Sequence, residues 1–172
     1  DADTLLRHAD QAMYLAKQAG RNRYHLFDML QDKEVQVQRE QHARLAQALR
    51  TGELVLFYQP KVDLETGDVV GAEALLRWQH PEQGLLSPGT FLWQLAGTEL
   101  EIELGEWVVH TALAQLTHWK HSFTGLPADF CISVNLSGHQ LLKPGFFGWM
   151  QGVLLRYPGV GPGELELEIL ES

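Results

Sequence analysis

The sequence has few of the residues on which several common classes of site depend. Cys131 is the single cysteine among 172 residues, which excludes a disulfide framework and any zinc site built from cysteines. No apolar run approaches the roughly 18 residues of a membrane span, and no secretory signal opens the chain. We therefore expect no membrane partner within this chain, a location in the reducing cytoplasm, and a small core residue at Cys131.

Basic residues are also scarce, since 13 Lys and Arg stand against 22 Asp and Glu and give a net charge of -9. Binding to a nucleic-acid polymer requires clustered Lys and Arg, so no such partner is expected. A small anionic ligand is compatible with this balance, because one Arg and a divalent metal can offset its charge locally. With 45% hydrophobic residues, the chain can form one globular domain with a core, or one domain and a fragment.

The first part of the chain predicts two helices separated by a short strand. Apolar residues at helical spacing predict an amphipathic helix over residues 2–20, and residues 24–27 predict a strand. These two elements cannot bury their own apolar faces, so we expect them to pack on neighbours or to belong to something larger. Residues 28–51 contain no Gly or Pro and predict one continuous helix. We interpret it as a linker that docks on the next domain, with a coiled-coil seam as the alternative.

After Gly52 the pattern changes to alternating strands and helices. Residues 54–62 and 69–78 predict two strands joined by a hairpin turn, and Pro60 suits an edge or end position because it lacks a donor. The remaining predicted elements are helices over 88–96, 101–119 and 144–155 and strands over 129–136 and 164–170. Strands separated by helices at this spacing indicate parallel βα units, so the predicted fold class is α/β.

Glu73 lies inside an otherwise apolar run, from Val69 to Trp78. An ionised Glu is almost never fully buried without a partner, so this side chain requires a metal, a cation or a ligand. An ion pair with Arg77, four residues later, or an exposed edge position would also explain it. This stretch alone favours neither explanation.

Two further polar residues, Asn135 and Glu168, lie in or at the ends of apolar predicted strands. Side chains near the carboxyl ends of the strands of a parallel α/β barrel converge on one mouth. Two carboxylates and one amide oxygen are ligands that Mg²⁺, Mn²⁺ or Ca²⁺ accepts more readily than Zn²⁺. Singly, the Asn could be a turn residue or helix cap, and an alternating Glu could face water. Together, Glu73, Asn135 and Glu168 predict a metal site.

The segment DQAMYLAKQAGRNRY, from Asp10 to Tyr24, resembles the closing segment of GGDEF (diguanylate cyclase) domains. The resemblance implies that residues 1–28 are the C-terminal remnant of such a domain and that residues 29–51 are a linker helix. In that family the residues matching Lys17 and Arg21 lie near the nucleotide phosphates. The Gly-Gly-Asp-Glu-Phe loop is absent, so no cyclase activity is implied, and we interpret both cations as solvated residues at a helix end.

The second part of the chain contains four motifs: YQPK at 58–61, GAEALLRW at 71–78, NLS at 135–137 and EILES at 168–172. They resemble consecutive motifs of EAL domains, the cyclic di-GMP phosphodiesterases. The similarity runs from about Leu54 to the last residue. It implies that residues 52–172 are the N-terminal half of an EAL domain, and therefore the first half of an EAL-type TIM (β/α) barrel.

The matching motifs also imply roles for individual residues. Glu73, Asn135 and Glu168 would be ligands of Mg²⁺ or Mn²⁺, and Glu171 would anchor the catalytic loop, which makes Glu73 and Glu171 the implied catalytic residues. In the family, two metals activate a water that attacks one phosphodiester of cyclic di-GMP in line and yields the linear dinucleotide. The residues implied to bind this substrate are Arg77 on a phosphate, Gln59 near a guanine and Leu75 beside the ligand.

The chain departs from the family pattern at its end. It stops at Ser172, before the Asp-Asp-Phe-Gly-type motif, the catalytic Lys and the final Glu, whereas a complete barrel takes roughly 250 residues. Leu170 also stands where Thr is more usual. We expect the parent protein to be a phosphodiesterase and this fragment to be inactive, with self-association through the EAL domain or the open sheet edge after Leu170. The alternatives are an EAL module that binds cyclic di-GMP as a sensor without cleaving it, and an interaction scaffold.

Overall fold

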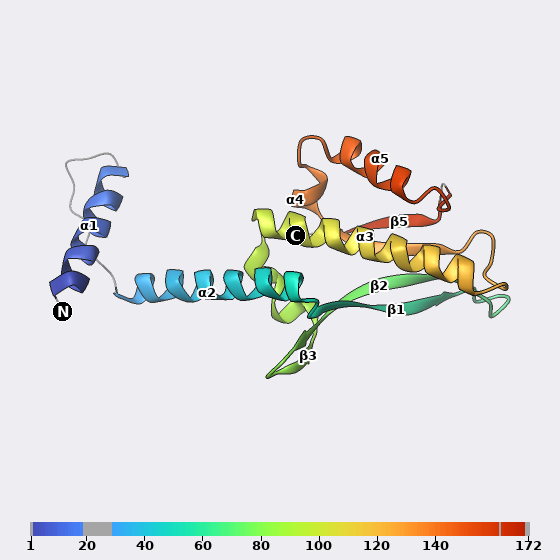
Figure 1. The fold of residues 1–172 in the computed structure, drawn as a ribbon, viewed down its shortest axis with the longest axis horizontal. Coiled ribbons are helices and arrows are strands. Elements are labelled where there is room, and N and C mark those ends of the chain that lie inside the picture. Colours follow the sequence, from blue (N-terminus) through green and yellow to red (C-terminus); the bar gives the residue numbers. More distant parts are fainter. Residues whose placement is uncertain (1, 19–28, 162, 171–172) are drawn as a thin grey trace. The chain divides into compact units, whose positions relative to one another are not determined.

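The computed structural model describes residues 2–18, 29–161 and 163–170 (Figure 1). The chain divides into two compact units, Asp1–Ala43 and Arg44–Ser172. The first unit holds helix α1 (Ala2–Gln18) and the beginning of helix α2 (Met29–Thr51). Both predicted helices are thus confirmed, and the strand predicted over residues 24–27 lies outside the described residues. No described helix has both the length and the apolar character needed to cross a membrane.

The second unit is built on a mixed sheet in the order β1-β2-β4-β5, with the short strand β3 paired to β2. The strands are β1 (Leu54–Val62), β2 (Val69–His80), β3 (Gly84–Leu86), β4 (Cys131–Ser137) and β5 (Leu165–Leu170). β1 and β2 form the predicted antiparallel hairpin, whereas β2, β4 and β5 run parallel. Parallel βα units are therefore confirmed, and Pro60 lies on an edge strand. Short β3 was not predicted.

The connections between strands are mostly helical. They are the 3₁₀ turns η1 (Pro88–Thr90) and η2 (Leu92–Leu95) and the α-helices α3 (Glu99–Ser122), α4 (Gly138–Leu141) and α5 (Phe146–Arg156). The single helix predicted over residues 88–96 is wrong, because the chain breaks at Phe91, whose φ of -136° is not helical. Phe91 instead fills the core at 1% exposure. The helices predicted at 101–119 and 144–155 are confirmed, and the one-turn helix α4 was not predicted.

Alternation along the strands gives the sheet one apolar and one polar face. Apolar side chains from β2 and β4 form one buried cluster with residues of α3, which covers this face (Figure 1). These strand residues are Ala72, Ala74, Leu76, Trp78, Ile132, Val134 and Leu136. The opposite side, which we call the polar face, carries Gln59, Lys61, Glu73, Ser133, Asn135, Glu166 and Glu168 at alternating positions. The candidate functional residues therefore lie on the side of the sheet that α3 does not cover.

Gly71 lets β2 and β4 approach closely at the start of their parallel pairing. A Cβ at this position would lie 2.6 Å from the Cys131 carbonyl oxygen and 3.0 Å from its sulfur. Such a contact with backbone is too short, so any larger residue would push the strands apart. Cys131 itself is only partly buried, whereas the sequence predicted a small core residue there.

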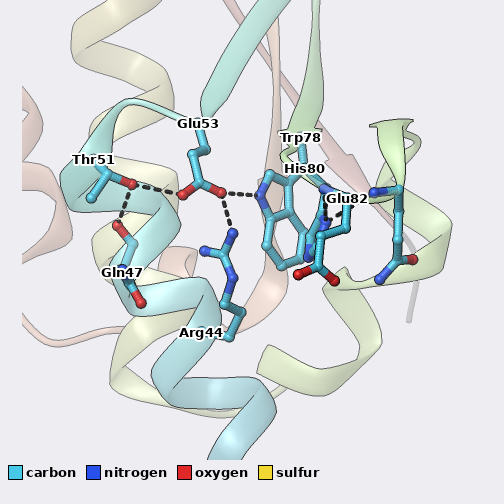
Figure 2. Close-up of polar contacts among 8 residues, drawn as sticks. Arg44, Gln47, Thr51, Glu53, Trp78, His80 and Glu82 are labelled. Atoms are coloured by element: carbon cyan, nitrogen blue, oxygen red, sulfur yellow. Dashed lines mark hydrogen bonds and ion pairs between the residues drawn. The ribbon is translucent and has the colours of Figure 1, made fainter.

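The end of α2, from Arg44 to Thr51, belongs to the second unit and packs on its core. Leu45 and Ala48 are 2% and 0% exposed and belong to the same core as the sheet. Figure 2 shows the Glu53 carboxylate between two donors: Arg44 Nη2 at 2.6 Å and the Trp78 indole Nε1 at 3.0 Å. The Thr51 hydroxyl donates to the same carboxylate at 3.0 Å. We call Arg44, Glu53 and Trp78 the junction cluster.

Candidate active site

The strand register brings three predicted residues together on the polar face. Glu73 of β2 lies opposite Ser133 of β4, and Asn135 of β4 lies opposite Glu168 of β5. The Asn135 amide Nδ2 donates to Glu73 Oε1 at 2.8 Å. Among the described residues no ion pair joins Glu73 to Arg77, so the simple pair considered from the sequence is wrong. Glu73 instead faces the two neighbouring strands.

A single cation, the Lys61 ammonium of β1, reaches across the face to β4 and β5. Its Nζ donates to Glu166 Oε2 at 2.7 Å and to Glu168 Oε1 at 3.0 Å, and it also contacts the Ser133 hydroxyl oxygen. The Ser133 hydroxyl in turn donates to Glu166 Oε2 at 2.5 Å. Ser133 is fully buried, which fixes the position of these donors. We call Lys61, Ser133 and Glu166 the support layer.

Electrostatics within this group follow from its short contacts. The hydrogen bond to Glu166 raises the pKa of Lys61 above its ordinary value, against the opposing effect of desolvation and with a further contribution from Glu168. The same contact, together with the Ser133 hydroxyl, lowers the pKa of Glu166. Both groups are therefore charged at neutral pH. Three carboxylates, Glu73, Glu166 and Glu168, share this face with one ammonium in direct contact.

The predicted substrate residues lie on the same side of β1 and β2. Gln59 is exposed and pairs in register with Glu73, and Leu75 pairs with Phe57. Arg77 is half-buried: its Nη1 donates to the Leu76 carbonyl oxygen at 2.7 Å, and its guanidinium lies 5.9 Å from the centre of the Phe57 ring. The structure thus aligns Gln59, Glu73, Leu75 and Arg77 along one edge of the polar face.

Sequence reasoning missed the support layer. Lys61 stands in the YQPK motif and Glu166 alternates with leucines on β5, but neither pattern shows which strands become neighbours. The predicted catalytic residue Glu171 lies outside the described residues. The sequence signal for Lys61 is that it is a cation on the edge strand β1, whereas β5 is acidic.

The donor set on the polar face fits a hard divalent cation by its chemistry. Glu73 and Glu168 supply carboxylate oxygens, and Asn135 retains an amide oxygen while its Nδ2 binds Glu73. Within the described residues, no group of three or more His, Cys, Asp or Glu side chains is arranged to hold a metal. A site here therefore depends on the amide of Asn135 as well as on carboxylates.

A cavity of about 810 Å³ lies elsewhere, between the hairpin turn after β1 and the loop from α3 to β4. Its lining includes Asp63, Asp68, Phe123 and Asp129. This loop leads into the amino end of β4, whereas parallel α/β barrels build their active sites at the carboxyl ends of the strands. We therefore do not assign this cavity to the candidate site.

Comparison with known proteins agrees with this geometry. Residues 42–172 match the EAL domain family. The chain is 42% identical, over 98% of its length and 24% of the relative's, to the bifunctional diguanylate cyclase/cyclic di-GMP phosphodiesterase MucR of Pseudomonas aeruginosa. It is 34% identical to the cyclic di-GMP phosphodiesterase PdeR of Escherichia coli, over 90% of this chain and 22% of that protein.

Solved structures give the same result. The phosphodiesterase PaMucR in complex with c-di-GMP superposes with a TM-score of 0.69 at 41% identity, covering 77% of this chain and 52% of that one. The EAL enzyme Bd1971, in its cGMP-bound form, superposes with a TM-score of 0.72 at 28% identity, covering 80% of this chain and 38% of that one. The chain thus spans about a quarter of its curated relatives and about half of the solved PaMucR chain. On these matches, the chain belongs to the EAL domain family.

Proposed function

We propose that this chain is the metal-binding and substrate-binding part of a phosphodiesterase that hydrolyses cyclic di-GMP to the linear dinucleotide. The observation that carries the proposal is the convergence of Glu73, Asn135 and Glu168 from three neighbouring strands onto one face. Two of them are already in contact, at 2.8 Å between Asn135 Nδ2 and Glu73 Oε1. Family membership and the cyclic di-GMP phosphodiesterase names of MucR and PdeR support the substrate.

The proposed metal centre uses Glu73, Asn135 and Glu168 as ligands of Mg²⁺ or Mn²⁺. When bound, divalent ions would lower the pKa of a water molecule for in-line attack and offset charge that develops on the phosphodiester. The chain's own part is to fix three oxygen donors on strands, whose packing limits their movement. The two-metal form of this chemistry needs more ligands than these three. The chain by itself is accordingly proposed to be inactive.

The proposed substrate contacts use the edge formed by β1 and β2. Arg77 is the available guanidinium on this edge, and its planar group suits bidentate contact with a phosphate. Gln59 is exposed beside Glu73 and can hydrogen-bond a base edge, while Leu75 offers an apolar contact. PaMucR was solved as a complex with c-di-GMP, which supports a ligand of this type. Glu171 is proposed, from its motif alone, to anchor a catalytic loop.

The first 51 residues are proposed to comprise a GGDEF remnant (1–28) and a linker helix (29–51), with the EAL part at 52–172. Within the first unit, Leu5, Leu6 and Met13 of α1 are 73%, 66% and 52% exposed, as expected for a helix that needs more chain to cover it. The match to MucR, named as bifunctional, extends over 98% of this chain. The family match begins at residue 42, inside α2. Cytoplasmic location and self-association through β5 stay predictions.

The test is hydrolysis of cyclic di-GMP by the full-length protein with Mg²⁺, comparing wild type with Glu73→Gln. We expect the variant to lose activity by at least about 100-fold, because an amide cannot replace the ligand charge. Exposed Glu82→Gln is the matched control and should keep full activity. Binding of cyclic di-GMP without turnover by the wild type would favour the sensor alternative. Turnover that survives in Glu73→Gln would contradict the metal-ligand assignment.

A further inference from the structure

Within the described part of the chain, Lys61 is the charged residue whose side chain extends from β1 across the polar face to β5. Its ammonium lies 3.0 Å from Glu168 Oε1, and Glu168 is a proposed metal ligand. The side chain is one-third exposed, so the contact is partly shielded from water. The function proposed above leaves this lysine without a role. Its position nevertheless puts it in hydrogen-bond contact with a proposed ligand carboxylate.

Two further contacts hold the ammonium in place. Ser133 is fully buried, and its hydroxyl binds both Lys61 and Glu166. Glu166 accepts from Lys61 at 2.7 Å and lies two residues before Glu168 on β5, on the same face. An ammonium has three donors, and here they meet a hydroxyl and two carboxylates. Lys61 is therefore fully used, and Glu168 can rotate away only by breaking this arrangement.

We propose that Lys61 is a positioning residue for the metal centre: it fixes the Glu168 carboxylate directly, and Ser133 and Glu166, the other members of the support layer, hold Lys61 in place. The inference rests on the proposed function, since it assumes that Glu168 is a ligand. Partners behind a ligand orient it and typically change metal affinity by about 10- to 100-fold when they are removed. Lys61 acts through Glu168 and needs no contact with the substrate.

Removing the lysine alone would change two things at once. Lys61→Met takes away the positioning contact, which weakens metal binding, and a positive charge, which strengthens it. The double variant Lys61→Met with Glu166→Gln removes one charge of each sign and so keeps the net charge of the face. It isolates the positioning effect. Lys61→Arg keeps both the charge and the donors and serves as the rescue variant.

The experiment is titration of the full-length, metal-free protein with Mn²⁺ by isothermal calorimetry, without substrate. We expect the dissociation constant of the double variant to rise about 10-fold, and that of Lys61→Arg to stay within about threefold of wild type. Lys143→Met is the matched control, because its ammonium lies 3.6 Å from Glu99 at an exposed site on other elements. It should bind Mn²⁺ as the wild type does.

Each outcome bears on a different claim. A double variant with wild-type Mn²⁺ affinity would overturn the positioning role while leaving the metal centre intact. Equal weakening in Lys143→Met would show that the effect is not specific to the Lys61 contacts and would also overturn the positioning role. If Glu73→Gln leaves Mn²⁺ binding unchanged, the proposed metal centre itself fails, and the role of Lys61 fails with it. Near-ultraviolet circular dichroism of every variant checks that the fold is retained.

Discussion

At the junction between α2 and the sheet one guanidinium meets one carboxylate, whereas on the polar face one ammonium meets two carboxylates and leaves a third beside an amide. The junction pair is electrically balanced, and the Trp78 indole satisfies a remaining lone pair of Glu53. On the polar face, Glu73, Glu166 and Glu168 stand against Lys61 and Arg77, which leaves a formal excess of one negative charge. Folding alone gives no reason to gather like charges there.

The difference distinguishes the junction cluster from the candidate site. The charges of the junction cluster are balanced, although Arg44 Nη1 is buried without a hydrogen-bond partner among the described residues, and the cluster joins α2 to the sheet. Like charges on neighbouring strands repel one another, and proteins retain such arrangements where a ligand or metal compensates them. Lys61 contacts two of the three carboxylates on the polar face, and the third, Glu73, contacts an amide. Changes in the two regions should therefore have opposite effects on stability and activity.

The largest expected effect is loss of activity in Glu168→Gln. Removing this proposed ligand should lower cyclic di-GMP hydrolysis by the full-length protein at least about 100-fold. The metal-free variant should be as stable as wild type or slightly more stable, because a surplus negative charge is gone. Hydrolysis rates with Mg²⁺ and urea unfolding of the same sample measure both quantities. A variant that loses stability but keeps its hydrolysis rate would show that Glu168 stabilises the fold and is not a metal ligand.

The junction should respond in the reverse way. Leu45→Ala removes a side chain that is 2% exposed in the core beneath α2, and it should lower the free energy of unfolding by about 2–5 kcal/mol. The rate per folded molecule should stay unchanged, because no candidate residue is touched. Leu142→Ala, at a position 82% exposed, is the control and should change stability by less than about 0.5 kcal/mol. Urea unfolding followed by tryptophan fluorescence provides the measurement.

Sequence patterns were sufficient for most of the second unit. The hairpin of β1 and β2, the parallel β4 and β5, and helix α3 were predicted because each has a strong period of its own and clear turn residues. The segment around Phe91 was predicted wrongly as one helix. Ser87 and Pro88 are typical of a helix start, but the backbone leaves helical geometry at Phe91, whose ring is buried in the core. Burial of this side chain therefore outweighed the local helix signal.

The candidate site was grouped from the sequence by residue type, and the sequence did not give the contacts within it. Glu73 and Asn135 were grouped as companions from chemistry and motif, and the structure joins them at 2.8 Å. The contact of Lys61 with Glu168 spans 107 positions of the sequence, and it depends on strand order and register. No periodicity in a single sequence encodes those two properties. For the same reason, the sequence left Glu53 without a partner, although its carboxylate joins α2 to β2.

The smallest expected effect is on the stability of the protein in acid, and it tests the junction cluster most directly. The hydrogen bond from Arg44, with those from Trp78 and Thr51, lowers the pKa of Glu53 from 4.5 to about 2. A carboxylate with a depressed pKa in the folded state contributes stability above its unfolded pKa and loses it as the pH falls through the folded value. Glu53 should therefore stabilise the fold fully above pH 4.5 and lose this contribution between there and about pH 2.

The variant Glu53→Gln has no charge to lose at this position. Its deficit in unfolding free energy relative to wild type should be constant above pH 4.5 and should shrink towards about pH 2. Urea unfolding at a series of pH values measures this difference. Arg44→Met should shift the window towards higher pH, since it removes the largest cause of the lowered pKa. Parallel curves for wild type and Glu53→Gln across the window would contradict the prediction. They would mean that the Arg44 contact forms in both the folded and the unfolded state, or in neither state. The packing of Leu45 and Ala48 would then hold the junction.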